Sequence, residues 1–185
     1  MMLLAHYILL GFEHVLPLGY DHLLFICALF FLNSRIKSAI LQCTVFTIAH
    51  SITLALTAVG TIHFNEKVCE TLIAFSIFLV AIENLYFQTV RLLRLVLVFV
   101  FGLVHGMGFA TALREAGLPK EDFIIGLLGF NIGVEFAQIT IVMILYYGIA
   151  KRLASKSSYQ ASIVPTISIS IACIGIFWCI ARLLQ

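Results

Sequence analysis

The sequence predicts an all-α integral membrane protein, a bundle of six transmembrane helices whose first helix is broken. Of the 185 residues, 62% are hydrophobic and only 11% are charged. A soluble domain of this length has too little interior to bury so much apolar surface. Apolar runs of about 20 residues, enough to cross a hydrocarbon core of about 30 Å, recur along the whole chain. We therefore expect residues 1–185 to form a single transmembrane domain.

Short breaks in hydrophobicity delimit the six predicted spans. They cover residues 17–33, 37–60, 68–88, 92–115, 122–150 and 163–184. Residues 2–16 are also apolar but too short to cross alone, and Pro17 lacks the backbone N–H that a continuous helix requires. We therefore expect the first helix to be interrupted at Pro17. Because residues 2–16 lack a preceding basic residue and a following small-residue cleavage site, we interpret them as part of the fold and not as a signal peptide.

The distribution of basic residues predicts an orientation. The loops after the first, third and fifth spans hold Arg35, Lys37, Arg91, Arg94, Lys151, Arg152 and Lys156. The other connections hold three basic residues, Lys67 and two within an acid-rich stretch, residues 114–122, while Arg182 departs from the pattern near the C-terminus. Because cytoplasmic loops are enriched in Lys and Arg, we predict that both termini lie outside. The net charge of +2 includes no basic block, so the expected partners are the lipid bilayer and an ion, not a nucleic acid.

Ionisable side chains lie inside or beside the apolar spans, and they are the candidate metal ligands. They are His14, Asp21, His22, His50, His105 and Glu135. Such groups are costly at membrane depth and rarely persist without a partner or a function. Counting about 1.5 Å per residue along each helix places His50, His105 and Glu135 near mid-membrane. The same count places Asp21 and His22 about one turn below the outer end of the first span.

The mixture of imidazole and carboxylate indicates the kind of ion. It suits borderline divalent ions such as Ni²⁺, Co²⁺, Zn²⁺ or Fe²⁺, whereas Cu⁺ would require Met and Cys, and Mg²⁺ or Ca²⁺ would require oxygen ligands alone. Five cysteines are present, none of them in a Cys-x-x-Cys pair, and we interpret them as small core residues.

Further residues are predicted to support the site. The small residues Gly106 and Ser51 allow close helix approach, and Thr53, Asn131 and Gln138 provide groups that hold ligands in place. Glu83 lies deeper, toward the cytoplasm, as the next position along a pathway. A weak internal repeat aligns residues 46–55 with residues 101–110, matching at Phe, His and Ala.

Simpler interpretations apply to several of these residues. A single histidine in a membrane more often forms an interhelical hydrogen bond than binds a metal, and it is their grouping that favours a site. His6, His63, Glu13 and Glu70 are expected at the membrane interface. Gly129 and Gly133, which flank Asn131, are explained by helix packing alone.

The chain resembles the HupE/UreJ family of small bacterial membrane proteins. The resemblance rests on residues 14–25, 46–54, 83–85, 101–110 and 130–138, which include the segments His-Val-Leu-Pro-Leu-Gly-Tyr-Asp-His and Val-His-Gly-Met-Gly. It implies a nickel or cobalt permease of the bacterial inner membrane, linked to the supply of hydrogenase or urease. It also implies that His14, Asp21, His22, His105 and Gly106 carry function, and it adds Asn84 beside Glu83 as a pathway residue.

Two departures from the hydrogenase-linked members bear on the substrate. Six residues, not five, separate His14 from Asp21, and no Glu follows the His105-Gly106 pair within the next turns. Glu135 is the expected substitute for that missing carboxylate.

We therefore predict a permease that passes Ni²⁺ or Co²⁺ from an outer site at His14, Asp21 and His22 to a mid-membrane site at His50, His105 and Glu135. An intramembrane metalloenzyme holding a Zn²⁺-type or Fe²⁺-type ion is an alternative, because a site with one open position can activate water. A non-catalytic metal-binding sensor or assembly protein is a third. The predicted function is transport in preference to catalysis.

Overall fold

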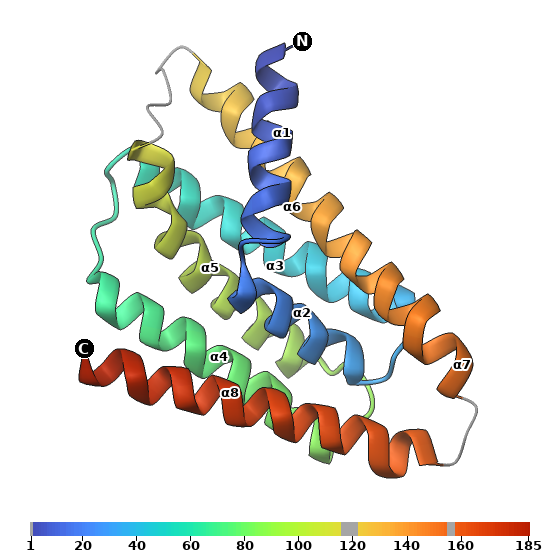
Figure 1. The fold of residues 1–185 in the computed structure, drawn as a ribbon. Helices are drawn as coiled ribbons and strands as arrows, with labels where there is room; N and C mark the ends of the chain where they lie inside the picture. Colours follow the sequence, from blue (N-terminus) through green and yellow to red (C-terminus); the bar gives the residue numbers. More distant parts are fainter. Residues whose placement is uncertain (1, 116–121, 155–157) are drawn as a thin grey trace.

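The computed structural model describes residues 2–115, 122–154 and 158–185, without the side chains of residues 109–115, and all regular secondary structure in the described residues is helical (Figure 1). The main helices are α1 (Met2–Val15), α2 (Tyr20–Phe31), α3 (Ile36–Ala58), α4 (Glu66–Tyr86), α5 (Leu92–Glu115), α6 (Phe123–Leu145) and α8 (Val164–Leu184). A π-helical turn, η2 (Tyr146–Ala150), and α7 (Lys151–Leu153) extend α6, and a second, η3 (Tyr159–Ile163), precedes α8. Lys156 and most of the predicted 114–122 connection lie outside the described residues.

The predicted break in the first helix is confirmed. The chain leaves α1 at Val15 and re-enters a helix at Tyr20, and the two helices are bent by 72°. Pro17 and Gly19 lie in this break. A Cβ atom on Gly19 would lie 2.3 Å from the carbonyl oxygen of His14, so only glycine permits the chain to turn back this closely. The bend brings the end of α1 over the start of α2.

The long apolar helices make this a multi-pass membrane protein, although the predicted count of six crossings is not confirmed. Four helical segments of the described chain are long and apolar enough to cross a membrane, and the bent pair of α1 and α2 would make a fifth. In α5, the apolar segment within the described residues is Leu92–Gly108, which is shorter than the four spans. The surface agrees with a lipid environment: Ile124, Leu128, Ile132 and Phe136 form an exposed apolar stripe at four-residue spacing along α6.

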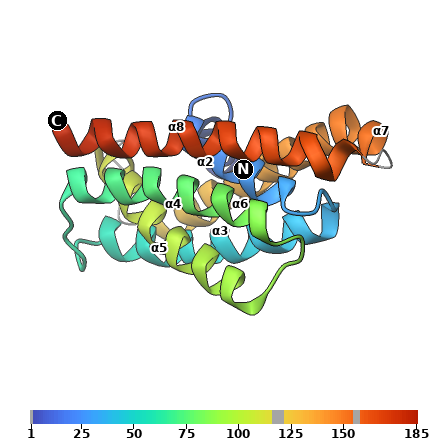
Figure 2. The ribbon, with the colours of Figure 1, turned by 90° about the horizontal axis from the view of Figure 1, so that it is seen from below.

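The helices associate as three close pairs around a central short helix (Figures 1 and 2). α3 packs along α5, α4 along α8 and α1 along α6, while α2 contacts α3, α4, α6 and α8. Glycines allow two of these pairs to approach backbone to backbone. A Cβ on Gly133 would lie 2.0 Å from the Ile8 carbonyl oxygen, and one on Gly102 would lie 2.6 Å from that of Phe46. The predicted packing role of Gly129 and Gly133 is accordingly seen between α6 and α1.

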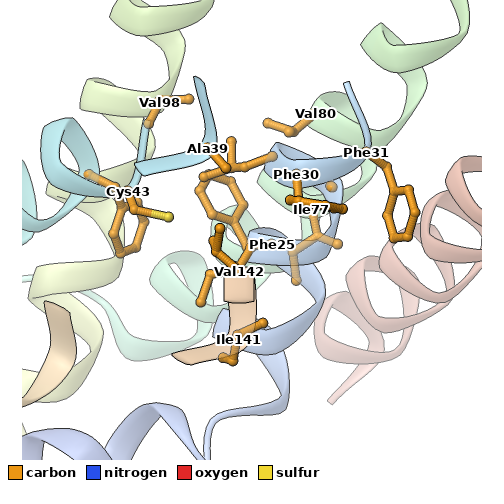
Figure 3. Packing of buried hydrophobic residues seen from close by; sticks show 14 of the residues in the cluster. Phe25, Phe30, Phe31, Ala39, Cys43, Ile77, Val80, Val98, Ile141 and Val142 are labelled. Atoms are coloured by element: carbon orange, nitrogen blue, oxygen red, sulfur yellow. The ribbon is translucent and has the colours of Figure 1, made fainter. Parts of the chain in front are cut away.

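The apolar core lies beside α2 and receives side chains from all seven main helices. Figure 3 shows Phe25 and Phe30 of α2 packed among Ala39 and Cys43 of α3, Ile77 of α4, Val98 of α5 and Val142 of α6. All five cysteines are free thiols; three are buried, Cys27 is half-buried and Cys173 is exposed. The core fixes α2, whose first turn carries one of the candidate ligands.

The predicted loop position of Arg94 is wrong. Arg94 was expected among the basic loop residues, but its side chain is fully buried and forms an ion pair with Glu83 at 2.8 Å. Its Nε also donates to Gln42 at 2.6 Å, and Nη2 donates to the Ala28 carbonyl oxygen at 3.3 Å. Asn84 donates to the same carbonyl oxygen at 2.8 Å. A buried guanidinium requires such partners, so Arg94 is a structural cation that ties α5 to α2, α3 and α4.

Candidate metal centre

Four imidazole rings from four helices meet in one cluster, which we call the histidine cluster: His14, His22, His50 and His105. His22 lies at its centre, with ring-centroid distances of 4.6 Å to His14, 5.3 Å to His105 and 6.0 Å to His50. His14 lies 6.2 Å from His50. The predicted outer and mid-membrane histidines are therefore not two separate sites; the structure brings them to one place.

The break after α1 explains half of this cluster. His14 belongs to the last turn of α1 and His22 to the first turn of α2. In one straight helix, eight residues would separate these side chains by about 12 Å. The 72° bend instead turns the two rings edge to face. The sequence Val-Leu-Pro-Leu-Gly between them is what permits the bend.

The close pairing of α3 with α5 supplies the other two rings. A Cβ on Gly106 would lie 2.2 Å from the carbonyl oxygen of His50 and 2.3 Å from Thr53 Oγ1. Thr53 donates a hydrogen bond to the Leu103 carbonyl oxygen at 2.7 Å. Gly102 lies against Phe46, and Gly106 lies against His50. Residue numbers therefore increase in the same direction along both helices, and α3 and α5 run parallel. Gly106 and Thr53, which were expected to support the site, thus lie where the backbones of α3 and α5 approach each other beside His50.

The rings are buried, and several of their nitrogens have no protein partner. His50 is 0% exposed, His105 2% and His22 7%. Nε2 of His105 shares a hydrogen bond with Ser76 Oγ at 3.0 Å. Within the described part of the chain, however, no hydrogen-bond partner reaches Nε2 of His22, either ring nitrogen of His50, or Nδ1 of His105. Buried polar atoms are normally satisfied, so this concentration of unsatisfied nitrogens makes the cluster the candidate binding site.

Aromatic side chains close the walls around the rings. Phe46 lies 5.0 Å from His105 and Phe25 lies 5.2 Å from it, centroid to centroid, and Phe130 lies 5.4 Å from His14. These walls limit water around the cluster and strengthen the interaction of a bound cation with its ligands. In the arrangement seen here, no three His, Cys, Asp or Glu side chains among the described residues converge on a single metal position. Binding an ion would therefore require the rings to rotate toward a common point.

A cavity of about 600 Å³ leads to the cluster. Its lining residues include three acidic ones, Glu13, Asp21 and Glu70, together with Arg182. His14, His22 and His105 also line it, whereas His50 does not. The cavity therefore reaches three of the four rings, and His50 lies behind them. Glu13 and Glu70, expected to be interfacial, are cavity residues that sequence reasoning did not connect with the site.

The two predicted carboxylate ligands have other partners in this structure. Asp21 forms an ion pair with Arg182 at 3.0 Å. Glu135 accepts hydrogen bonds from Thr44 and Thr47, each at 2.7 Å, and Gln138 donates to Thr47 at 3.1 Å. Thr47 precedes His50 by about one helical turn, so this group of polar residues lies next to the histidine cluster along α3.

The remaining predicted residues make local contacts. Ser51 donates to the Thr47 carbonyl oxygen at 2.6 Å, and Asn131 donates to that of Leu127 at 2.8 Å. Glu83, the predicted pathway position, is the partner of Arg94. Ser76 was not predicted to be part of the site, although a hydroxyl in the middle of an apolar span is a signal that could have indicated it.

Comparison with known proteins places this site in a family context. The family model described as HupE / UreJ protein matches residues 1–182. No curated protein and no solved structure matches the chain. The match includes every helix that contributes to the cluster and the cavity. The chain belongs to the HupE/UreJ family of membrane proteins.

Proposed function

We propose that the protein is a permease for a divalent transition-metal ion and that the histidine cluster is the position the ion occupies inside the bundle. The observation that carries this proposal is the meeting of four buried imidazoles, with unsatisfied nitrogens on three of them, beside a cavity lined by carboxylates. The HupE/UreJ family is associated with nickel and cobalt transport. Imidazole nitrogens bind Ni²⁺ and Co²⁺ well, so these two ions are the proposed substrates.

The path begins in the cavity. Glu13, Asp21 and Glu70 provide negative charge that raises the local concentration of cations. The ion then exchanges water for ring nitrogens at His14, His22 and His105, which face the same cavity, and reaches His50 behind them. Each step replaces weakly bound oxygen ligands by imidazole nitrogen.

A hydrogen-bonded ion pair lies near the start of α5, about three helical turns before His105. Arg94, Glu83 and Gln42 are joined by hydrogen bonds of 2.6 and 2.8 Å there, and the Thr44, Thr47 and Glu135 group lies between them and the cluster along α3. We infer an ion path open to the cavity side and closed on the Arg94 side. With both termini outside, as the basic loops predict, the cavity faces outward and the direction is import.

Nickel binding and uptake test the proposal. Replacing His50 by Ala removes a buried ligand, so H50A should lose nickel binding in purified protein and nickel uptake in vesicles. His63 is exposed in the loop before α4, and H63A removes the same side chain without touching the cluster. H63A should retain wild-type binding and uptake.

Two other outcomes would contradict the proposal. Wild-type uptake by H50A would show that the ion does not pass through the cluster. An ion that remains bound in equal molar amount through prolonged chelation would indicate a resident metal of an enzyme or a structural site, because a transported ion must leave its site readily.

A further inference from the structure

Arg182 places a permanent cation inside the cavity that leads to the histidine cluster. Its Nη2 lies 3.0 and 3.2 Å from the two carboxylate oxygens of Asp21, and its Nη1 donates to the Glu70 carbonyl oxygen at 2.8 Å. The guanidinium carbon lies 5.6 Å from the centre of the Trp178 ring. These contacts hold the guanidinium at the cavity wall from two helices besides its own.

The position of Asp21 makes this contact relevant to an entering ion. Asp21 precedes His22, the central ring of the cluster, and both residues line the cavity. A cation in the cavity therefore meets Asp21 and His22 as neighbouring residues of the same wall. In this structure the Asp21 carboxylate is already paired with the guanidinium of Arg182.

We propose that Arg182 is a specificity-determining residue, a tethered cation that competes with entering ions for Asp21 and admits divalent ions in preference to monovalent ones. The inference rests on the proposed function, since it assigns a selection step to the same path. Arg182 acts through Asp21 and does not bind the ion itself.

Charge explains the selection. A monovalent ion that displaces the guanidinium exchanges one positive charge for another and loses the geometry of two hydrogen bonds. A divalent ion doubles the Coulomb attraction to the same carboxylate and is also attracted by Glu13 and Glu70 in the cavity wall. The released guanidinium keeps its other contacts, with the Glu70 carbonyl oxygen and the Trp178 ring. Replacing the guanidinium at Asp21 therefore lowers the free energy of a divalent ion but not that of a monovalent ion.

A purely structural role for Arg182 predicts the opposite result. If the ion pair only held the cavity in shape, its loss would deform the site and weaken ion binding. If Arg182 is a competitor, its loss frees Asp21 and strengthens ion binding. The sign of the change in affinity therefore separates the two roles.

The test is nickel titration of the purified full-length protein by calorimetry. R182Q should bind NiCl₂ roughly threefold to tenfold more tightly than wild type at low salt, the range expected when a partly exposed ion pair of about 1 kcal/mol no longer competes. Raising KCl toward about 0.1 M should reduce nickel affinity more steeply in R182Q than in wild type, since potassium can then occupy Asp21. In a D21N background, R182Q should produce no tightening.

Lys67 provides a matched control. It is an exposed cation in the first turn of α4, one turn from Glu70, so K67Q makes the same change in net charge at the same end of the bundle without touching Asp21. K67Q should follow wild type in affinity and in potassium dependence.

The possible failures are distinguishable. If wild type binds no divalent ion, the proposed function falls and this inference falls with it. If wild type binds nickel but R182Q binds it equally or more weakly, or if K67Q tightens binding as much as R182Q, the inference is wrong and the proposed function is unaffected.

Discussion

Replacing Gly106 by Ala adds one methyl group between α3 and α5, and we expect it to move His50 and His105 apart. In G106A the new Cβ would lie 2.2 Å from the His50 carbonyl oxygen and 2.3 Å from Thr53 Oγ1, whereas real Cβ atoms essentially never come closer than 3.0 Å. Neither atom can move away easily, because one is backbone and the other is held by its bond to Leu103. α5 must therefore move about 0.8 Å from α3.

That displacement is large for both the fold and the site. It would stretch the 2.7 Å Thr53–Leu103 hydrogen bond to about 3.5 Å, beyond useful length. Overpacking of this kind costs about 1–3 kcal/mol of stability. Metal–ligand distances tolerate only about 0.2 Å of error, and a disturbed support costs about tenfold to hundredfold in metal affinity. We therefore expect G106A to bind nickel at least tenfold more weakly while remaining folded.

Gly108 offers the matched control on the same helix. A Cβ there would meet only the end of the Ile73 side chain at 3.0 Å and Cys69 Sγ at 3.5 Å, both of which can adjust. G108A should keep wild-type nickel affinity in calorimetry and nearly wild-type thermal stability. If G106A binds nickel as tightly as G108A does, then the spacing of α3 and α5 does not set the position of His50 relative to His105, and the account of the cluster given above is wrong.

Two further predictions concern charge. Replacing Arg94 by Leu leaves Glu83 partly buried without its cation, so R94L should lower the free energy of unfolding by about 3–5 kcal/mol, measured by denaturant titration. R91L, which removes an exposed arginine, should change the free energy of unfolding little. Equal effects of the two substitutions would contradict the stabilising role of the buried ion pair. Nickel binds neutral imidazole, so protons and metal compete for the ring nitrogens, and nickel affinity should fall once the pH is low enough to protonate the buried rings. An affinity that stays constant down to the lowest pH at which the protein remains folded would show that the ligands are not imidazoles.

The sequence was sufficient to predict the broken first helix, because Pro17 and Gly19 impose local backbone constraints that act regardless of the rest of the fold. It also predicted the close approach of α3 and α5, since small residues beside His50 and His105 leave room for backbone contact. Each of these features is indicated by residues that are neighbours in sequence: Pro17 and Gly19 for the break, and Gly106 beside His105 for the approach.

The partners of the charged groups could not be predicted in the same way. Counting residues along a helix gives depth, but in helices that are apolar almost all round it does not give the direction in which a side chain points. Counting residues predicted that Glu135 lies at the same membrane depth as His50, yet its carboxylate accepts hydrogen bonds from Thr44 and Thr47. Asp21 pairs with Arg182, which is 161 residues away in sequence, and no local pattern indicates that contact. Arg94 follows a loop by only a few residues, so its burial becomes visible only once Glu83 and Gln42 surround it.

The attachment of α1 to α6 means that His14 reaches the histidine cluster on a different helix pair from His50 and His105. Gly11, Gly129 and Gly133 join α1 and α6 backbone to backbone, whereas α1 barely touches α2. His14 is thus carried by the α1–α6 pair, while His22, anchored by α2, adjoins His50 and His105 on the paired α3 and α5. Because Glu135 of α6 accepts hydrogen bonds from Thr44 and Thr47 of α3, the α1–α6 pair is itself joined to the helix that carries His50. A change in the contact between α6 and α3 would therefore move His14 relative to His50, although the two residues lie on helices that are distant in sequence.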